Sequence, residues 1–264
     1  MNTDRRTGYI ALLDVLGFSE LISRESRNDD LQRYFDAIDV ATSSDGQPVE
    51  FVLFSDTIVI SAPDDSEHSL LAVLRAASFA MHYLLAAGLP VRGAISHGGY
   101  LRSQSEKGVL IAGAAFVEAY RFEKAQNWVG ILVTPSVLRS FPALTVRCAA
   151  IPNQVGSPET RAELEDRIDW AILVQQCHAI PWHGSNPFGE DRYTGYAVVP
   201  TDPGWRREAR EIAAGLKGIA QRLADQRLLA ADPQAQSKYD VPHQWIGSLV
   251  QAWQGLANQM GAQT

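Results

Sequence analysis

The chain has 264 residues, 46% of them hydrophobic and 20% charged, which is the composition of an ordinary water-soluble domain with a full core. Its net charge of −7 provides no basic field to gather nucleic acid or an anionic membrane surface. Two cysteines without metal-ligand spacing, and no apolar run near the roughly 20 residues of a membrane span, predict a cytoplasmic protein.

Residues 1–150 predict a catalytic core of alternating strands and helices. In chain order, the expected elements are a buried strand at 9–15, a helix ending near residue 37, strands at 50–55 and 57–62, an amphipathic helix at 70–85, strands at 89–99 and 108–113, a helix at 114–124 and a strand at 129–134. This order is typical of a ferredoxin-like, palm-type βαββαβ core with helices on one face. The predicted fold class is therefore α+β.

Residues 151–264 predict a C-terminal extension packed on this core. Its expected elements are strands at 169–177 and 193–200, followed by helices at 205–229 and 246–257. An apolar stripe along the last helix is more typical of core or dimer packing than of a ligand site.

Two aspartates carry the chemistry that the sequence predicts. Asp14 ends the first strand, and Asp56 is the acid at the tip of the predicted hairpin. Magnesium is usually bound by one or two carboxylates together with substrate phosphates, so two converging aspartates favour metal-assisted phosphoryl chemistry. The glycine-containing turn after Asp14 offers backbone amides to phosphate oxygens. For either aspartate taken singly, an ordinary turn residue is the alternative interpretation.

Four segments resemble, in the correct order, the signature blocks of class III nucleotidyl cyclases. They are DVLGFS (14–19), FSDTIVIS (54–61), VRGAISHGG (91–99) and GAAFVEAYRFE (113–123), and in the last block Gly113, Arg121 and Glu123 keep the family's offsets. The resemblance implies a homodimer whose active sites lie at the interface. It also assigns the site residues: Asp14, Asp56 and the Val15 carbonyl for two Mg²⁺ or Mn²⁺ ions, amides of Gly17, Phe18 and Ser19 for the phosphates, and Arg121 for the developing charge.

Three positions depart from the family's pattern. Val117 stands where the family has a transition-state-orienting Asn, and Val52 and Leu110 stand where purine cyclases place a Lys and an Asp that recognise the base. An apolar pair cannot make the hydrogen bonds that distinguish adenine from guanine.

The compact layout also resembles the pyrimidine cyclases of the bacterial Pycsar antiphage system. That resemblance implies conversion of UTP, or next CTP, to a 3′,5′-cyclic mononucleotide that a separate effector protein reads. Two alternatives stay open: a catalytically degenerate, nucleotide-binding regulator, and an adenylate or guanylate cyclase.

Overall fold

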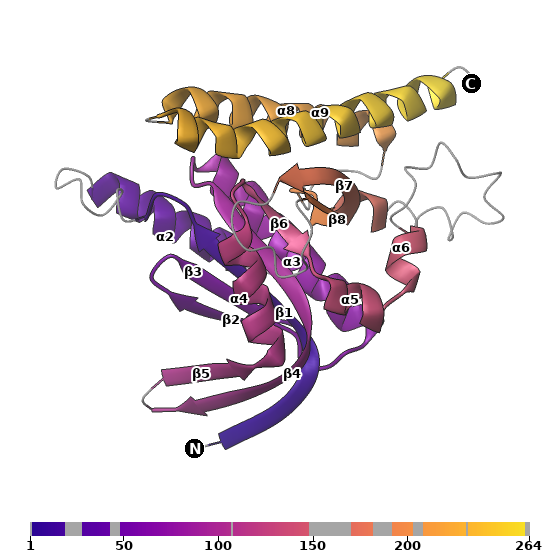
Figure 1. Ribbon diagram of the computed structural model, residues 1–264. Coiled ribbons are helices and arrows are strands. Elements are labelled where there is room, and N and C mark those ends of the chain that lie inside the picture. The colour runs from indigo at the N-terminus through magenta and orange to yellow at the C-terminus, as the bar shows by residue number, and fades with distance from the viewer. Residues whose placement is uncertain are drawn as a thin grey trace.

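The computed structural model describes residues 2–18, 28–42, 48–106, 108–147, 170–181, 192–202, 208–230 and 232–261. The elements are β1 (Asn2–Val15), α2 (Asn28–Thr42), β2 (Glu50–Phe54), β3 (Thr57–Ser61), α3 (Glu67–Ala86), β4 (Val91–Ser105), β5 (Gly108–Gly113), α4 (Ala114–Ala125), β6 (Gly130–Val133), α5 (Pro135–Ser140), α6 (Ala143–Arg147), β7 (Val174–Pro181), β8 (Arg192–Val198), α8 (Ala209–Leu229) and α9 (Pro233–Gly261). Figure 1 shows their arrangement.

All the described strands belong to one eight-stranded sheet. Its order is β2-β3-β1-β4-β6-β8-β7, with β5 paired to the far end of β4. β1 is antiparallel to both β3 and β4, whereas β4 and β6 are parallel. The sequence β1-α2-β2-β3-α3-β4 with β1 between β3 and β4 is the ferredoxin-like arrangement. The predicted α+β class and βαββαβ core are confirmed.

The helices cover both faces of the sheet, which corrects the expectation of helices on one face. Alternate residues of a strand point to opposite faces. On β1, Tyr9 and Leu13 are buried in the large cluster that includes α3, while Ile10 packs with Ala115 of α4. Figure 1 accordingly shows α3 behind the sheet and α4 in front of it. Because α4 lies on the opposite face of the sheet from α3, it can line a pocket on that face.

α3 is the core helix of the fold. Ser66 caps it by accepting a hydrogen bond from the Ser69 amide at 3.2 Å. By length and composition the helix could cross a membrane, but 72% of its most apolar window is buried within the protein. A helix that is apolar on nearly all sides is expected where a sheet and further helices enclose it.

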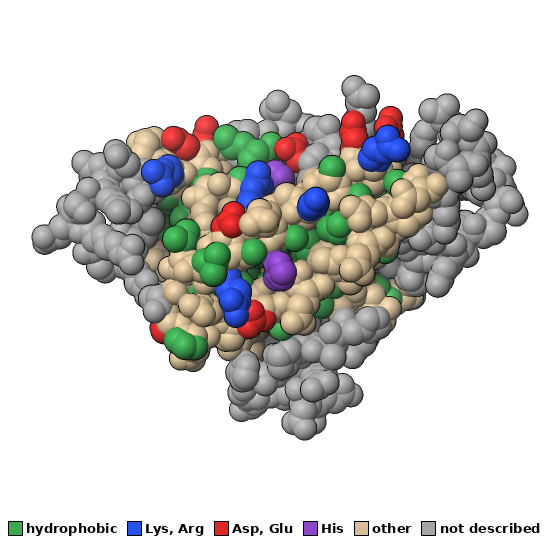
Figure 2. Space-filling view, turned by 90° about the horizontal axis from the view of Figure 1, so that it is seen from above, with side chains coloured by type: hydrophobic (Ala, Val, Ile, Leu, Met, Phe, Trp, Pro, Cys, Tyr) green, Lys and Arg blue, Asp and Glu red, His purple; other side chains and the backbone are tan. Residues whose placement is uncertain are grey.

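The C-terminal part of the chain continues the same sheet and covers one end of it. β8 pairs with β6, and the Trp245 indole of α9 donates a hydrogen bond to the Gln176 carbonyl of β7 at 3.1 Å. α8 and α9 lie together across the top in Figure 1, and seen from above in Figure 2 their face carries small, interspersed groups of both charges. The strand expected at 169–177 begins only at Val174, because residues 170–173 are helical.

Candidate active site

Asp14 and Asp56 lie at the same end of the sheet. In the β1–β3 ladder Asp14 is opposite Thr57, and the Val15 amide donates to the Asp56 carbonyl at 2.9 Å. The turn between β2 and β3 is the two-residue Ser55-Asp56 connection, in which Ser55 takes a φ of +56°. The hairpin predicted from the sequence thus brings its acid next to the end of the first strand.

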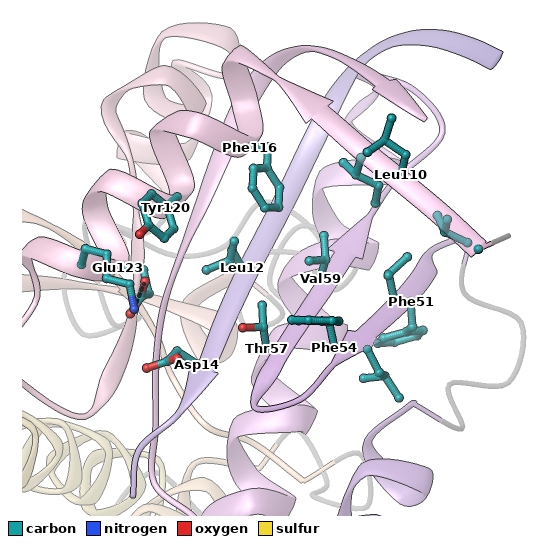
Figure 3. Close-up of a pocket in the computed structure, with 16 residues that line it drawn as sticks. Leu12, Asp14, Phe51, Phe54, Thr57, Val59, Leu110, Phe116, Tyr120 and Glu123 are labelled. Carbon is teal, nitrogen blue, oxygen red and sulfur yellow. Dashed lines mark ion pairs between the residues drawn. The ribbon is translucent and has the colours of Figure 1, made fainter. Parts of the chain in front are cut away.

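A pocket of about 770 Å³ opens from Asp14 along the α4 face of the sheet (Figure 3). Asp14 and Glu123 lie at one end of the pocket, and Leu110 and Phe51 lie at the other. The lining residues are Leu12, Asp14, Phe51, Val52, Leu53, Phe54, Thr57, Val59, Gly108, Val109, Leu110, Ile111, Phe116, Tyr120, Glu123 and Lys124. The pocket therefore joins a charged end to a long apolar and aromatic wall.

The structure separates the predicted site residues into two groups. Asp14, Val52 and Leu110 line the pocket together, although they come from three different strands. Asp56 and Arg121 are not among the lining residues, and the Arg121 side chain is exposed on α4.

The predicted phosphate loop is described as far as Phe18. Gly17 takes a φ of +79°, a conformation that favours glycine, and Phe18 is buried. Ser19, the third residue predicted to hold phosphate, lies outside the described residues.

An arginine joins two carboxylates at the charged end. Arg92 is opposite Asp14 in the β1–β4 ladder, and its Nη2 lies 3.1 Å from Asp14 Oδ2. Its Nε lies 2.6 Å from Oε1 of Glu123, and the Lys124 ammonium lies 3.5 Å from the other oxygen of the same carboxylate. Glu123 is 1% exposed. Burial raises the pKa of this carboxyl, and Arg92 opposes that shift by stabilising the charged form.

Carboxylates are hard oxygen donors of the kind that Mg²⁺ and Mn²⁺ take, and Asp14 and Asp56 lie at the same end of the sheet. Magnesium needs only one or two protein carboxylates when substrate phosphates complete its coordination. Among the described residues no group of three or more His, Cys, Asp or Glu side chains is gathered in a metal-binding arrangement. Two carboxylates at this end of the sheet fit an ion whose coordination is completed by the oxygens of a phosphate-bearing substrate.

Arg92, Glu123 and Lys124 are residues of this region that the sequence alone does not assign. Arg92 is visible in the strand sequence, but its contact with Asp14 depends on β4 lying directly beside β1. Glu123 keeps the family's offset in the sequence, but its burial and its contact with Arg92 appear only in the structure.

Comparison with known proteins gives structural similarity only. No protein-family model and no curated protein matches the sequence. The fold is similar to the catalytic core of a rhodopsin-guanylyl cyclase in complex with ATPαS, at 12% identity over 76% of this chain and all of that one, with a TM-score of 0.48.

It is also similar to adenylate cyclases from Trypanosoma brucei in their monomeric state (13% identity, 74% of this chain and 88% of that one, TM-score 0.47) and to the guanylyl cyclase Cya2 (15% identity, 77% and 98%, TM-score 0.45). With TM-scores below 0.5, these matches carry no argument about chemistry, which depends on the site itself.

Proposed function

We propose that this protein is a metal-dependent nucleotidyl cyclase. Its substrate is a pyrimidine nucleoside triphosphate, UTP in preference to CTP, and its products are the 3′,5′-cyclic mononucleotide and pyrophosphate. The observation that carries the proposal is the single pocket that joins the Asp14 carboxylate to an apolar wall containing Val52 and Leu110. One end suits a metal-bound triphosphate, and the other suits a base that is held by packing.

In the proposed reaction, the ribose 3′-oxygen forms a bond to the α-phosphorus, its proton is released, and the bond to the departing pyrophosphate breaks. Asp14 and Asp56 are the proposed ligands of two Mg²⁺ or Mn²⁺ ions, with the Val15 carbonyl as a further oxygen. When bound, such ions activate the hydroxyl and stabilise charge on the α-phosphate. The chain's own contribution is to orient the substrate: the amides of Gly17, Phe18 and Ser19 hold the phosphates.

The pocket wall supports a pyrimidine substrate. The side chains of Val52 and Leu110 offer no hydrogen bonds, while Phe116 and Tyr120 from α4 provide aromatic surfaces. A site that recognises a purine through hydrogen bonds has polar side chains, and these are left unpaired at a cost in free energy when a different base binds. Val52 and Leu110 have no such polar groups. Packing on an apolar wall is compatible with the smaller base.

A second copy of the chain would complete the site. Phe54 is 78% exposed and Leu110 is 58% exposed, and both belong to the rim of the pocket. Exposed apolar surface of this kind is typical of a protein interface. In the proposed homodimer, the exposed Arg121 of one subunit serves the partner's site by stabilising the developing phosphate charge.

The proposed setting is the bacterial cytoplasm, where the cyclic nucleotide acts as a second messenger in antiphage defence and a separate effector protein reads it. This assignment is supported only by the resemblance of the sequence motifs to Pycsar cyclases. A test for it is a plaque assay in cells that carry the wild-type protein or Asp14→Asn together with the native effector.

A nucleotide-binding regulator is the second candidate function, and two observations favour it. Asp14 already has a cationic partner in Arg92, and Val117 provides no orienting amide. A regulator of this kind would bind the triphosphate without releasing pyrophosphate. Turnover therefore distinguishes the two candidates.

The deciding experiment incubates the purified protein with ATP, GTP, CTP or UTP and Mn²⁺, and resolves the products by mass spectrometry. A cyclic pyrimidine nucleotide is expected from the wild type and from Asp225→Asn, an exposed acid on α8 that serves as the matched control. Asp14→Asn and Asp56→Asn should form none. Equal activity in Asp56→Asn would refute the metal assignment, and binding without any product would favour the regulator.

A further inference from the structure

One tyrosine connects three segments of the candidate site. Tyr34 of α2 is 4% exposed, and its hydroxyl donates a hydrogen bond to the Ser55 carbonyl at 2.6 Å. Its ring packs against Phe18, with centroids 4.8 Å apart and planes inclined by 51°. Phe18 belongs to the turn after Asp14, and Ser55 is adjacent to Asp56. The Tyr34 side chain thus contacts two turns: the turn that follows Asp14 and the turn that contains Asp56.

The turn held by Tyr34 adopts a conformation that serine rarely takes. Ser55 has a φ of +56°, in the left-handed region, where a non-glycine residue is strained by about 1 kcal/mol or more. Such a conformation persists only where its surroundings fix it. The Phe54–Thr57 pair of the β2–β3 ladder closes the turn. Within the described chain, two further hydrogen bonds hold it from either side: the Tyr34 hydroxyl to the Ser55 carbonyl, and the Val15 amide to the Asp56 carbonyl.

The hydrogen bond from Tyr34 is well placed to act on Asp56. Its acceptor is the carbonyl of the residue that immediately precedes Asp56, so its loss allows the peptide between the two residues to rotate. The Asp56 charge also contributes to the raised pKa of the Tyr34 hydroxyl, behind the larger effect of burial. The two groups are therefore close enough to influence each other electrostatically.

We propose that Tyr34 is a positioning residue for the metal site. It holds the Ser55-Asp56 turn, and through Phe18 the turn after β1, so that the Asp56 carboxylate is pre-organised before a divalent ion and a triphosphate bind. The inference rests on the proposed function, because it needs Asp56 to be a metal ligand. Its physical basis is that a ligand set fixed in advance loses less conformational entropy on binding.

The test compares two tyrosine variants that lose the same kind of hydrogen bond. Tyr34→Phe removes the bond to Ser55 but keeps the ring on Phe18. Tyr100→Phe removes a buried hydroxyl that donates to the Ala62 carbonyl and accepts from Arg6, on β4, which does not line the pocket. Both variants should lower the unfolding midpoint, Tyr100→Phe by at least as much as Tyr34→Phe because its hydroxyl has the second partner. Binding of Mn²⁺ in the presence of inorganic triphosphate, which cannot be cyclised, is followed by electron paramagnetic resonance. It should weaken about two- to tenfold in Tyr34→Phe and stay unchanged in Tyr100→Phe.

A second measurement does not require a metal. Amide hydrogen exchange at residues 54–57 should accelerate in Tyr34→Phe and not in Tyr100→Phe, because only the first releases the turn. Equal Mn²⁺ affinity and equal exchange in the two variants would overturn the positioning role. If wild-type protein binds Mn²⁺ and Asp56→Asn does not, the metal assignment stands whatever Tyr34 does. If wild-type protein binds no Mn²⁺ even with inorganic triphosphate present, both proposals are overturned.

Discussion

Gly93 of β4 occupies a position where the sheet has no room for a side chain. A Cβ added there would lie 2.5 Å from the Leu12 carbonyl oxygen and 3.2 Å from Leu13 Cα, both atoms of the β1 backbone. No rotation of a side chain can relieve such a contact, so β1 and β4 must separate. We expect Gly93→Ala to lower the free energy of unfolding by about 1–3 kcal/mol, the usual cost of overpacking a core. Equilibrium urea denaturation measures this directly.

Gly99 is the matched control, since it lies on the same strand and also faces β1. A Cβ there meets only the Arg6 carbonyl oxygen, at 4.0 Å, and the residue is exposed. Gly99→Ala should therefore be neutral, or stabilising by about 0.4–1 kcal/mol through the reduced entropy of the unfolded chain. A similar loss in both variants, or no loss in Gly93→Ala, would refute the close-approach argument.

Three further predictions concern stability. Ser66→Ala removes the N-cap of α3 and should cost about 1 kcal/mol in thermal or urea unfolding. Hydrogen bonds from Ser66 and Ser69 hold the pKa of Asp64 below its usual value, so this acid stabilises the fold fully above about pH 4. That contribution, seen as the stability difference from Asp64→Asn, should disappear as the pH falls through the lowered pKa; a pH-independent difference would contradict it. Arg92→Met leaves Glu123 buried without its main cation and should cost about 3 kcal/mol, part of which the double variant Arg92→Met with Glu123→Met should restore. If the two substitutions are simply additive, Arg92 does not stabilise the buried carboxylate.

The sequence predicted the parts of the fold that depend on local pattern. The hairpin around Asp56 follows from two short β-rich runs separated by a polar tip, and α3 follows from its apolar spacing. Val52 and Leu110 line one pocket with Asp14, and their role in holding the base stays a prediction. Local patterns succeed here because the strands and helices of the first half are well separated by turn residues.

Features that depend on tertiary structure were not predictable in the same way. The Arg92 contact with Asp14 needs the β1–β4 register, which no local pattern encodes. β4 continues through Gly98 and Gly99 to Ser105 because β5 folds back on it, although two glycines suggest that a strand ends. The last helix is longer than predicted. α9 starts at Pro233 and continues through Pro242, although proline is a helix-breaking residue by propensity alone.

The shortest strand of the sheet, β6, decides whether a fragment of the chain can be expressed in soluble form. β6 has four residues, all buried, between parallel β4 and antiparallel β8. A fragment that ended before β8 would uncover unpaired backbone groups along β6, whose four residues are all buried, and such an edge is a template for edge-to-edge aggregation. Recombinant expression of the first 150 residues alone should therefore give insoluble material, and the proposed activity is best assayed in the full chain.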